Sequence, residues 1–304
     1  MEEYRRLSWS AWLLTKKPMM TDLPVAKAQL LGRANDFDGG HTARWLSSLG
    51  SKTTWRAVRD PHTGHTIHCV SDRPWSSLTA DLSLGLRLLA WMSHRVAVTW
   101  YWWDQPWTRI LPSNTKPRKE HLNGGWATPG VPEVHVYRRE EAHKVLIHET
   151  IHALGLDVEH ASIDPIRPQF EADLGHRLWP HLGEAFTEFY AEWLWSISAA
   201  SSLADARKRW TSQLACSEGQ AATVWRRIRG STEDENTNVF AYYVLKWVLM
   251  GHQVEVLLGP KRTVSHWFEW WVAAKPRLEE LAEGEGVVGS ESIEIKMGMT
   301  CGSL

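Results

Sequence analysis

The sequence is poor in cysteine, with only Cys69, Cys216 and Cys301 among 304 residues. Their number is odd and their spacing is wide, so neither a disulfide framework nor a cysteine-based zinc site is expected. A secretory leader is not indicated either, because the start is acidic and the apolar stretch from Leu7 to Leu14 is interrupted by serines. Together these features predict a reducing, intracellular compartment.

Long apolar runs and an excess of one charge are also lacking. No segment reaches ~20 apolar residues, so we expect no membrane span. The formal net charge is −1, which gives no electrostatic reason for nucleic-acid binding. The oligomeric state is not readable from the sequence. Tryptophan, in contrast, is abundant at 20 residues. We expect most of these rings in the core and in cleft walls, and stacking on a ligand is the alternative.

The order of secondary-structure patterns predicts an α+β fold in two subdomains. Two β-rich runs flank a turn-forming segment, which is typical of a hairpin, and a helical pattern and two strand patterns follow. The chain is almost wholly helical after residue 181. We therefore expect a small sheet with an edge strand, a helical C-terminal part and an active-site cleft between them. The strand patterns cover residues 53–58, 65–70, 96–103 and 133–138, and the helical patterns cover 76–94, 140–154, 182–200, 203–229, 238–250 and 263–282.

These patterns also suggest domain boundaries. Residues 1–95 form a helical and hairpin region of unknown role, and residues 96–282 form the core. The core divides into an α/β part, 96–155, and a helical part, 156–282. Residues 283–304 are rich in Gly, Ser and Glu, so they are expected to be a flexible tail.

The most informative motif is His148-Glu149-Thr150-Ile151-His152. Residues four apart lie on the same face of a helix, so His148 and His152 can bind one metal ion. Zinc with three protein ligands keeps a fourth position for water, and Glu149 stands where it can take a proton from that water. The helical pattern around the motif ends at Gly155, a good C-terminal stop.

A third protein ligand is needed, and the sequence offers several candidates downstream. Glu184 and Glu188 stand out because they lie one turn apart near the start of an apolar helix, where buried carboxylates need a cation. Glu184 would bind the metal, and Glu188 would accept a hydrogen bond from a ligand imidazole. The other candidates are Asp157, His160, Asp164, Glu171, Asp173, His176 and His181.

The two motifs together resemble those of the gluzincin metallopeptidases, the group that includes thermolysin and related aminopeptidases. The resemblance covers about residues 130–250 and implies a zincin-like fold with one Zn²⁺ per chain. It implies Glu184 as the third ligand and Glu188 as the residue that supports a ligand histidine. Two departures stand out: 31 residues separate His152 from Glu184, and Gly183 replaces the usual asparagine. A metzincin-like continuation is the rival, but Val158 stands where that pattern needs a metal ligand.

The resemblance also implies a hydroxyl or imidazole donor for the developing oxyanion and a strand that holds the substrate. Tyr242 and Tyr243 are the candidates for the donor, with Tyr243 slightly preferred. The strand at 133–138 would be the edge strand and would pair with an extended peptide through the backbone at Val134 and Val136. Before it, Gly124 and Gly125 would form a wall of the substrate cleft, a plain loop being the alternative.

We therefore expect a zinc metallopeptidase that hydrolyses peptides or proteins, with Glu149 as general base. Two other functions stay open. One is a zinc hydrolase of a non-peptide bond, because the metal chemistry is the same. The other is a tryptophan-rich binding protein on a metallopeptidase scaffold.

Overall fold

The computed structural model describes residues 8–25, 27–33, 39–108, 110–111, 118–158, 160–229, 233–258, 264–284 and 295–296. The chain forms two compact units. The sheet unit consists of residues 7–109 and 119–156, and the helical unit consists of residues 1–6, 110–118 and 157–304.

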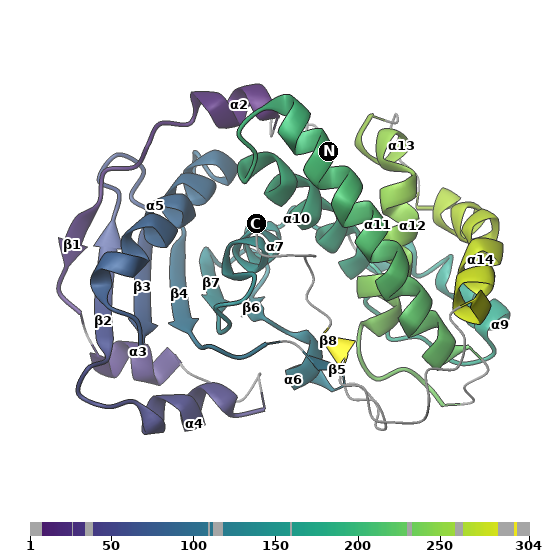
Figure 1. The fold of residues 1–304 in the computed structure, drawn as a ribbon, viewed down its shortest axis with the longest axis horizontal. Coiled ribbons are helices and arrows are strands. Elements are labelled where there is room, and N and C mark those ends of the chain that lie inside the picture. Colours follow the sequence, from purple (N-terminus) through teal and green to yellow (C-terminus); the bar gives the residue numbers. More distant parts are fainter. Residues whose placement is uncertain are drawn as a thin grey trace. The chain divides into compact units, whose positions relative to one another are not determined.

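The sheet unit is built on a six-stranded mixed sheet with the order β1-β2-β3-β4-β7-β6 (Figure 1). The pairs β3·β4 and β4·β7 are parallel, and the other pairs are antiparallel. The strands are β1 (Thr21–Leu23), β2 (Thr54–Arg59), β3 (Thr66–Ser71), β4 (Thr99–Asp104), β6 (Gly125–Ala127) and β7 (Glu133–Val136). The helices are α2 (Trp9–Leu14), α3 (Lys27–Arg33), α4 (His41–Ser48), α5 (Trp75–Met92), α6 (Lys119–Leu122) and α7 (Ala142–Ala153).

Both faces of the central strands are covered. On β4, Trp100 and Trp102 face His143 of α7, with ring centroids 6.0 and 6.2 Å from it. Tyr101 and Trp103 face the other way and belong to a cluster that includes residues of α3 and α4. All four aromatic residues are buried. The tryptophans of this strand therefore build two apolar cores, as the parallel centre of a sheet requires.

The sequence suggested that residues 1–95 form a separate region, but the structure does not separate them from the main sheet. They supply β1, β2 and β3, which continue the same sheet as β4 and β7. The predicted hairpin is confirmed, since β2 and β3 pair antiparallel from Thr54↔Ser71 to Arg59↔Thr66. The strand order is decided by long-range pairing, which local periodicity does not encode.

The edge strand was predicted at the wrong position. β7 lies inside the sheet, between β4 and β6, so Val134 and Val136 have paired strands on both sides and are fully buried. The edge strand is β6, which contains Gly125, Trp126 and Ala127. The alternation at 133–138 suggested one solvated face, but His135 on the supposedly polar face is fully buried as well.

A buried carboxylate fixes the ends of three neighbouring strands. Asp104 ends β4 and accepts hydrogen bonds from Ser71 at the end of β3 and from Arg73, whose Nε lies at 2.7 Å. Arg139, three residues beyond β7, donates to Asp104 from Nε at 3.1 Å. Arg139 also pairs with Asp72, so two carboxylates hold its guanidinium group.

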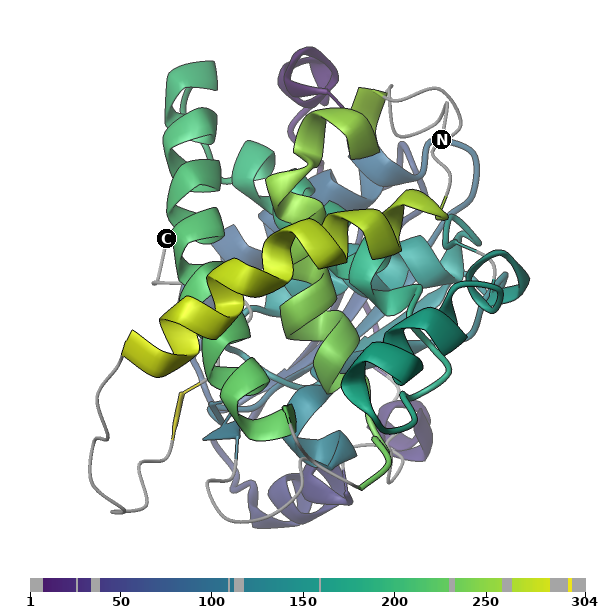
Figure 2. The same cartoon turned by 90° about the vertical axis from the view of Figure 1, so that its right-hand side faces the viewer.

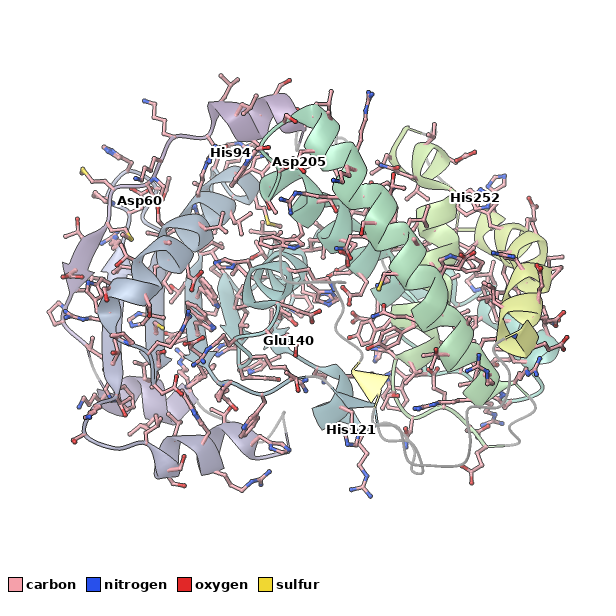
Figure 3. All side chains as sticks on the ribbon, in the orientation of Figure 1. Asp60, His94, His121, Glu140, Asp205 and His252 are labelled. Atoms are coloured by element: carbon pink, nitrogen blue, oxygen red, sulfur yellow. The ribbon has the colours of Figure 1, made fainter. Side chains whose placement is uncertain are left out.

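In the helical unit, η1, α11 and α12 contact one another, and α10 and α14 pack against them (Figure 2). α11 begins with a capping bond from Asp205 N–H to the Ser202 hydroxyl, and Asp205 pairs with Arg209 at 3.2 Å (Figure 3). The elements are α8 (His160–Ile163), α9 (Arg167–Leu174), α10 (Glu184–Ser198), α11 (Leu203–Ile228), the π-helix η1 (Phe240–Leu245), α12 (Lys246–Gly251), α13 (Gln253–Leu258), α14 (His266–Gly284) and a small sheet of β5 (Ile110–Leu111) and β8 (Ile295–Lys296).

Two expectations about the chain's ends and thiols need correction. Within the tail expected to be flexible, Ile295 and Lys296 pair with β5, and the other residues beyond α14 lie outside the described part. Cys216 is disulfide-bonded, whereas Cys69 is free and buried. Widely spaced cysteines carry no local signal of pairing, which is why the sequence indicated none.

Among the helices of the described residues, none is both long and apolar enough to cross a membrane.

Candidate metal centre

The helix that carries the motif is almost wholly buried. α7 packs on β7, β6 and α5, and its buried residues include His148 and Glu149. The predicted stop is confirmed: Gly155 has a φ of 63° and its N–H donates to the His152 carbonyl at 2.9 Å. At the other end, Glu141 is the N-cap residue with a φ of 64°, the only positive value among the described non-glycine residues. Both ends of α7 are thus fixed by left-handed residues.

The two histidines of the motif converge on one point. Nε2 of His152 lies 3.0 Å from Nε2 of His148, and the rings are inclined at 70°. Two nitrogens bound to one tetrahedral zinc at 2.0–2.1 Å would be separated by about 3.3 Å. His148 is buried and His152 is half-buried. The helix therefore presents two imidazole nitrogens at the spacing that a shared metal ion requires.

Glu149 lies against the edge strand. A Cβ atom added to Gly125 would stand 2.9 Å from Cγ of Glu149 and 2.4 Å from the backbone oxygen of His135. Gly125 is therefore needed for space, since it has no positive φ. This contact places the backbone of β6 beside the carboxyl group that follows the first histidine.

Replacing Gly125 with alanine should destabilise the sheet unit. The new methyl group meets a backbone oxygen that cannot move without shifting β7, so we expect a loss of about 1–3 kcal/mol in the free energy of unfolding. Urea unfolding of the two proteins measures it. Gly219→Ala in α11 is the control, because nothing lies within 4 Å of its Cβ and alanine favours a helix. Equal stability of Gly125→Ala and wild type would contradict the close packing.

The backbone of Gly124 takes part in the pairing of β6 with β7. Its carbonyl accepts the N–H of Tyr137 at 2.9 Å, so Gly124 continues the ladder between β6 and β7. Along an antiparallel ladder, every second residue forms backbone hydrogen bonds with the partner strand. Because Gly124 is bonded to β7, the next residue of β6 that bonds to β7 is Trp126. The N–H and C=O groups of Gly125 and Ala127 therefore face the free edge. The Gly125 carbonyl accepts the Tyr137 hydroxyl at 3.2 Å.

The second predicted motif opens α10 in the helical unit. Glu184 is the first residue of the helix and is half-buried, and Glu188 one turn later is fully buried. A carboxylate in the first turn is favoured by the helix dipole. Thr187 donates to the Asp157 carboxylate at 3.0 Å, which ties the start of α10 to the segment after α7.

The two tyrosine candidates differ in their contacts. The Tyr242 hydroxyl donates to Oε2 of Glu184 at 3.3 Å. Tyr243 is fully buried, and the ammonium group of Lys246 lies 6.0 Å from its ring centroid. Both belong to η1, and π-helical turns are frequent at functional sites. Of the pair, Tyr242 is the one with a hydrogen bond to the candidate ligand.

The three predicted ligands are residue types that can bind a metal ion. His148 and His152 lie on α7 in the sheet unit, and Glu184 opens α10 in the helical unit. The 31 residues between the motifs contain α8 and α9. They extend the chain between the motifs without moving Glu184 from the start of its helix.

One carboxyl group near the site was not singled out from the sequence. Glu235 accepts hydrogen bonds from Trp179 N–H and Phe240 N–H, each at 2.8 Å. It lies in the acidic run Glu233-Asp234-Glu235, and such a run by itself predicts a solvent-exposed turn. Its partners become apparent only in the folded chain.

Comparison of the chain with protein-family models, with curated proteins and with solved structures found no match.

Proposed function

We propose that the chain is a zinc-dependent peptidase with a zincin-like fold of the gluzincin type. The observation that carries the proposal is the 3.0 Å approach of the His148 and His152 Nε2 atoms on a buried helix. The two Nε2 atoms point at one place, and a single metal ion could bind both nitrogens at once. Glu184 would complete the set, so that two histidines and one carboxylate hold one zinc ion.

The donor set fits zinc better than magnesium or calcium, which prefer oxygen ligands. A zinc ion held by these residues would lower the pKa of a bound water towards ~7 and would polarise a carbonyl group. The carboxylate of Glu149 accepts a proton from the attacking water and can return it to the leaving amine. Tyr242 donates its hydroxyl proton towards the negative charge that develops on the substrate oxygen.

The free edge of β6 supports a peptide as substrate. The backbone of Gly125 lies beside Glu149, and an extended peptide could add as a further strand to the outer edge of Gly125 and Ala127. A small non-peptide substrate would not use this row of donors and acceptors. The tryptophan-rich binding alternative has less support, because Trp100, Trp102 and Trp103 are no more than 1% exposed.

Zinc content and peptide hydrolysis test the proposal. Protein purified and dialysed without chelator should hold one zinc ion per chain and cleave members of a peptide library. Chelation should abolish cleavage, and added zinc should restore it. His152→Ala should lose the zinc, whereas substitution of the exposed His94 by alanine should not.

Absence of stoichiometric zinc from the wild-type chain would refute the proposal. Bound zinc without cleavage of any peptide would instead favour a non-peptide substrate.

A further inference from the structure

The segment that leads into α10 is held by carboxylates. Three consecutive N–H groups donate to three different side chains: Arg177 to Asp234 at 3.1 Å, Leu178 to Glu171 at 3.0 Å and Trp179 to Glu235 at 2.8 Å. Hydrogen bonds from backbone N–H groups to ionised carboxylates are about twice as strong as neutral ones. This fixes the chain five residues before Glu184.

Glu235 differs from the other two carboxylates because it also binds the start of η1. Its Oε2 accepts Trp179 N–H, and its Oε1 accepts Phe240 N–H at 2.8 Å. Val239 N–H donates to the same group. Two residues after Phe240 comes Tyr242, whose hydroxyl reaches Oε2 of Glu184 at 3.3 Å. One carboxyl group therefore fastens both chain segments that bring the Tyr242 hydroxyl and the Glu184 carboxylate together.

We propose that Glu235 is a positioning residue for the peptidase site: by holding Trp179 and Phe240 it sets the place of the Tyr242 hydroxyl relative to Glu184. The inference rests on the proposed function, in which Glu184 binds zinc and Tyr242 acts on the substrate oxygen. It concerns a residue that touches neither metal nor substrate and acts through the two segments it joins.

The charge of Glu235 gives the proposal a second observable. Burial raises the pKa of this carboxyl to about 7, against the opposing effect of its backbone hydrogen bonds from Phe240, Trp179 and Val239. The charged and titratable groups on the joined segments are His176, Arg177, His181, Glu233 and Asp234, with Glu171 on α9. Because the carboxylate is the stronger acceptor, the fastening should tighten as the pH rises through neutrality.

Glu235→Gln is the sharpest variant, because it keeps the shape but has one acceptor oxygen in place of two. It can hold Trp179 or Phe240 but not both. Residues that support a metal site in this indirect way typically change metal affinity or activity about 10–100-fold. We expect a decrease of that size in kcat and in zinc affinity, the latter measured by competition with a chelator. In a plot of kcat against pH, the variant should also lack the rise near neutral pH that ionisation of Glu235 contributes.

Asp234→Asn is the matched control, since Asp234 accepts the Arg177 N–H in the same loop and its amide keeps an acceptor oxygen, so both values should stay within about twofold of wild type. In a Tyr242→Phe background, Glu235→Gln should add little, because its effect passes through Tyr242. Wild-type kcat and zinc affinity in Glu235→Gln, or a full additional loss in the Tyr242→Phe background, would overturn the proposal.

Failure of the proposed function is seen separately, as a wild-type chain without zinc. In that case amide hydrogen exchange at Trp179 and Phe240 still tests the fastening. At least one of the two amides should exchange about tenfold faster in Glu235→Gln than in wild type, and unchanged exchange at both would overturn it. If Glu235→Gln does not fold, Glu235→Asp, which is one methylene shorter, replaces it in every comparison.

Discussion

Glu149→Gln should abolish peptide hydrolysis while zinc stays bound. The amide has nearly the shape of the carboxylate, so it fits the space beside Gly125 and leaves His148 and His152 untouched. It cannot accept a proton from the attacking water. General-base catalysis typically contributes about 10²–10⁴-fold to the rate, and we expect a loss of kcat of that size.

The measurement is kcat on the best substrate of the peptide library, together with the zinc content of each protein. Glu140→Gln is the control, because Glu140 is half-buried and lies two residues before α7 (Figure 3). It should keep both zinc and activity. Full turnover by Glu149→Gln would exclude Glu149 as the base, and loss of zinc from this variant would show that its effect is on the metal site.

The features that the sequence predicted correctly around the candidate site are those encoded within one helix. The four-residue spacing of His148 and His152 fixes their common face, whatever the rest of the fold does. Gly155 ends the helix for a reason that is equally local, namely that glycine adopts positive φ without strain. The motif and its boundaries could therefore be read from about fifteen residues.

The edge strand could not be read in this way. Whether β7 or β6 lies at the edge depends on the pairing of Trp126 with His135, which follows from chain reversal at residues 128–132. A three-residue strand such as β6 has too few positions to show an alternation. Its Gly-Trp-Ala sequence looks like a loop, and only the close approach of Gly125 to Glu149 reveals its importance.

Partners distant in sequence were missed for the same reason. Glu235 lies 56 residues from Trp179, and Asp104 lies 35 residues from Arg139. Each carboxylate satisfies backbone or guanidinium donors that become neighbours only after folding. A buried acid with several donors looks in the sequence like any charged residue of a surface turn.

The second large effect concerns His135, at the centre of the sheet unit. Its ring is fully buried and stacks on Trp126 at 3.8 Å and on Tyr101 at 4.9 Å. Within the described residues, neither ring nitrogen makes a hydrogen bond, and the nearest carboxylate, Glu133, is 3.9 Å away and already paired with Arg33. Protonation would therefore place a buried charge between two aromatic rings, with a carboxylate nearby that Arg33 already neutralises.

Burial, with a smaller contribution from the charge of Arg33, lowers the pKa of His135 from 6.5 to about 3. The unfolded chain then binds the proton more readily than the folded chain. Stability is fully present above pH 6.5 and falls as the pH drops from 6.5 towards 3. The whole shift corresponds to about 5 kcal/mol, of which about 3 kcal/mol is lost by about pH 4.5.

His135→Phe should remove this part of the acid sensitivity, because it keeps a flat ring between Trp126 and Tyr101 and has no proton to bind. The free energy of unfolding in urea, measured at about pH 7.5 and about pH 4.5, should fall by about 3 kcal/mol less in the variant than in wild type. The comparison uses the change with pH, so any packing cost of the larger ring cancels. Gln in place of the exposed His94 should leave the wild-type change intact. If the variant loses as much stability between the two pH values as wild type does, the buried imidazole of His135 is not the group that senses acid. His65, which is buried and whose pKa is also lowered, is then the next candidate.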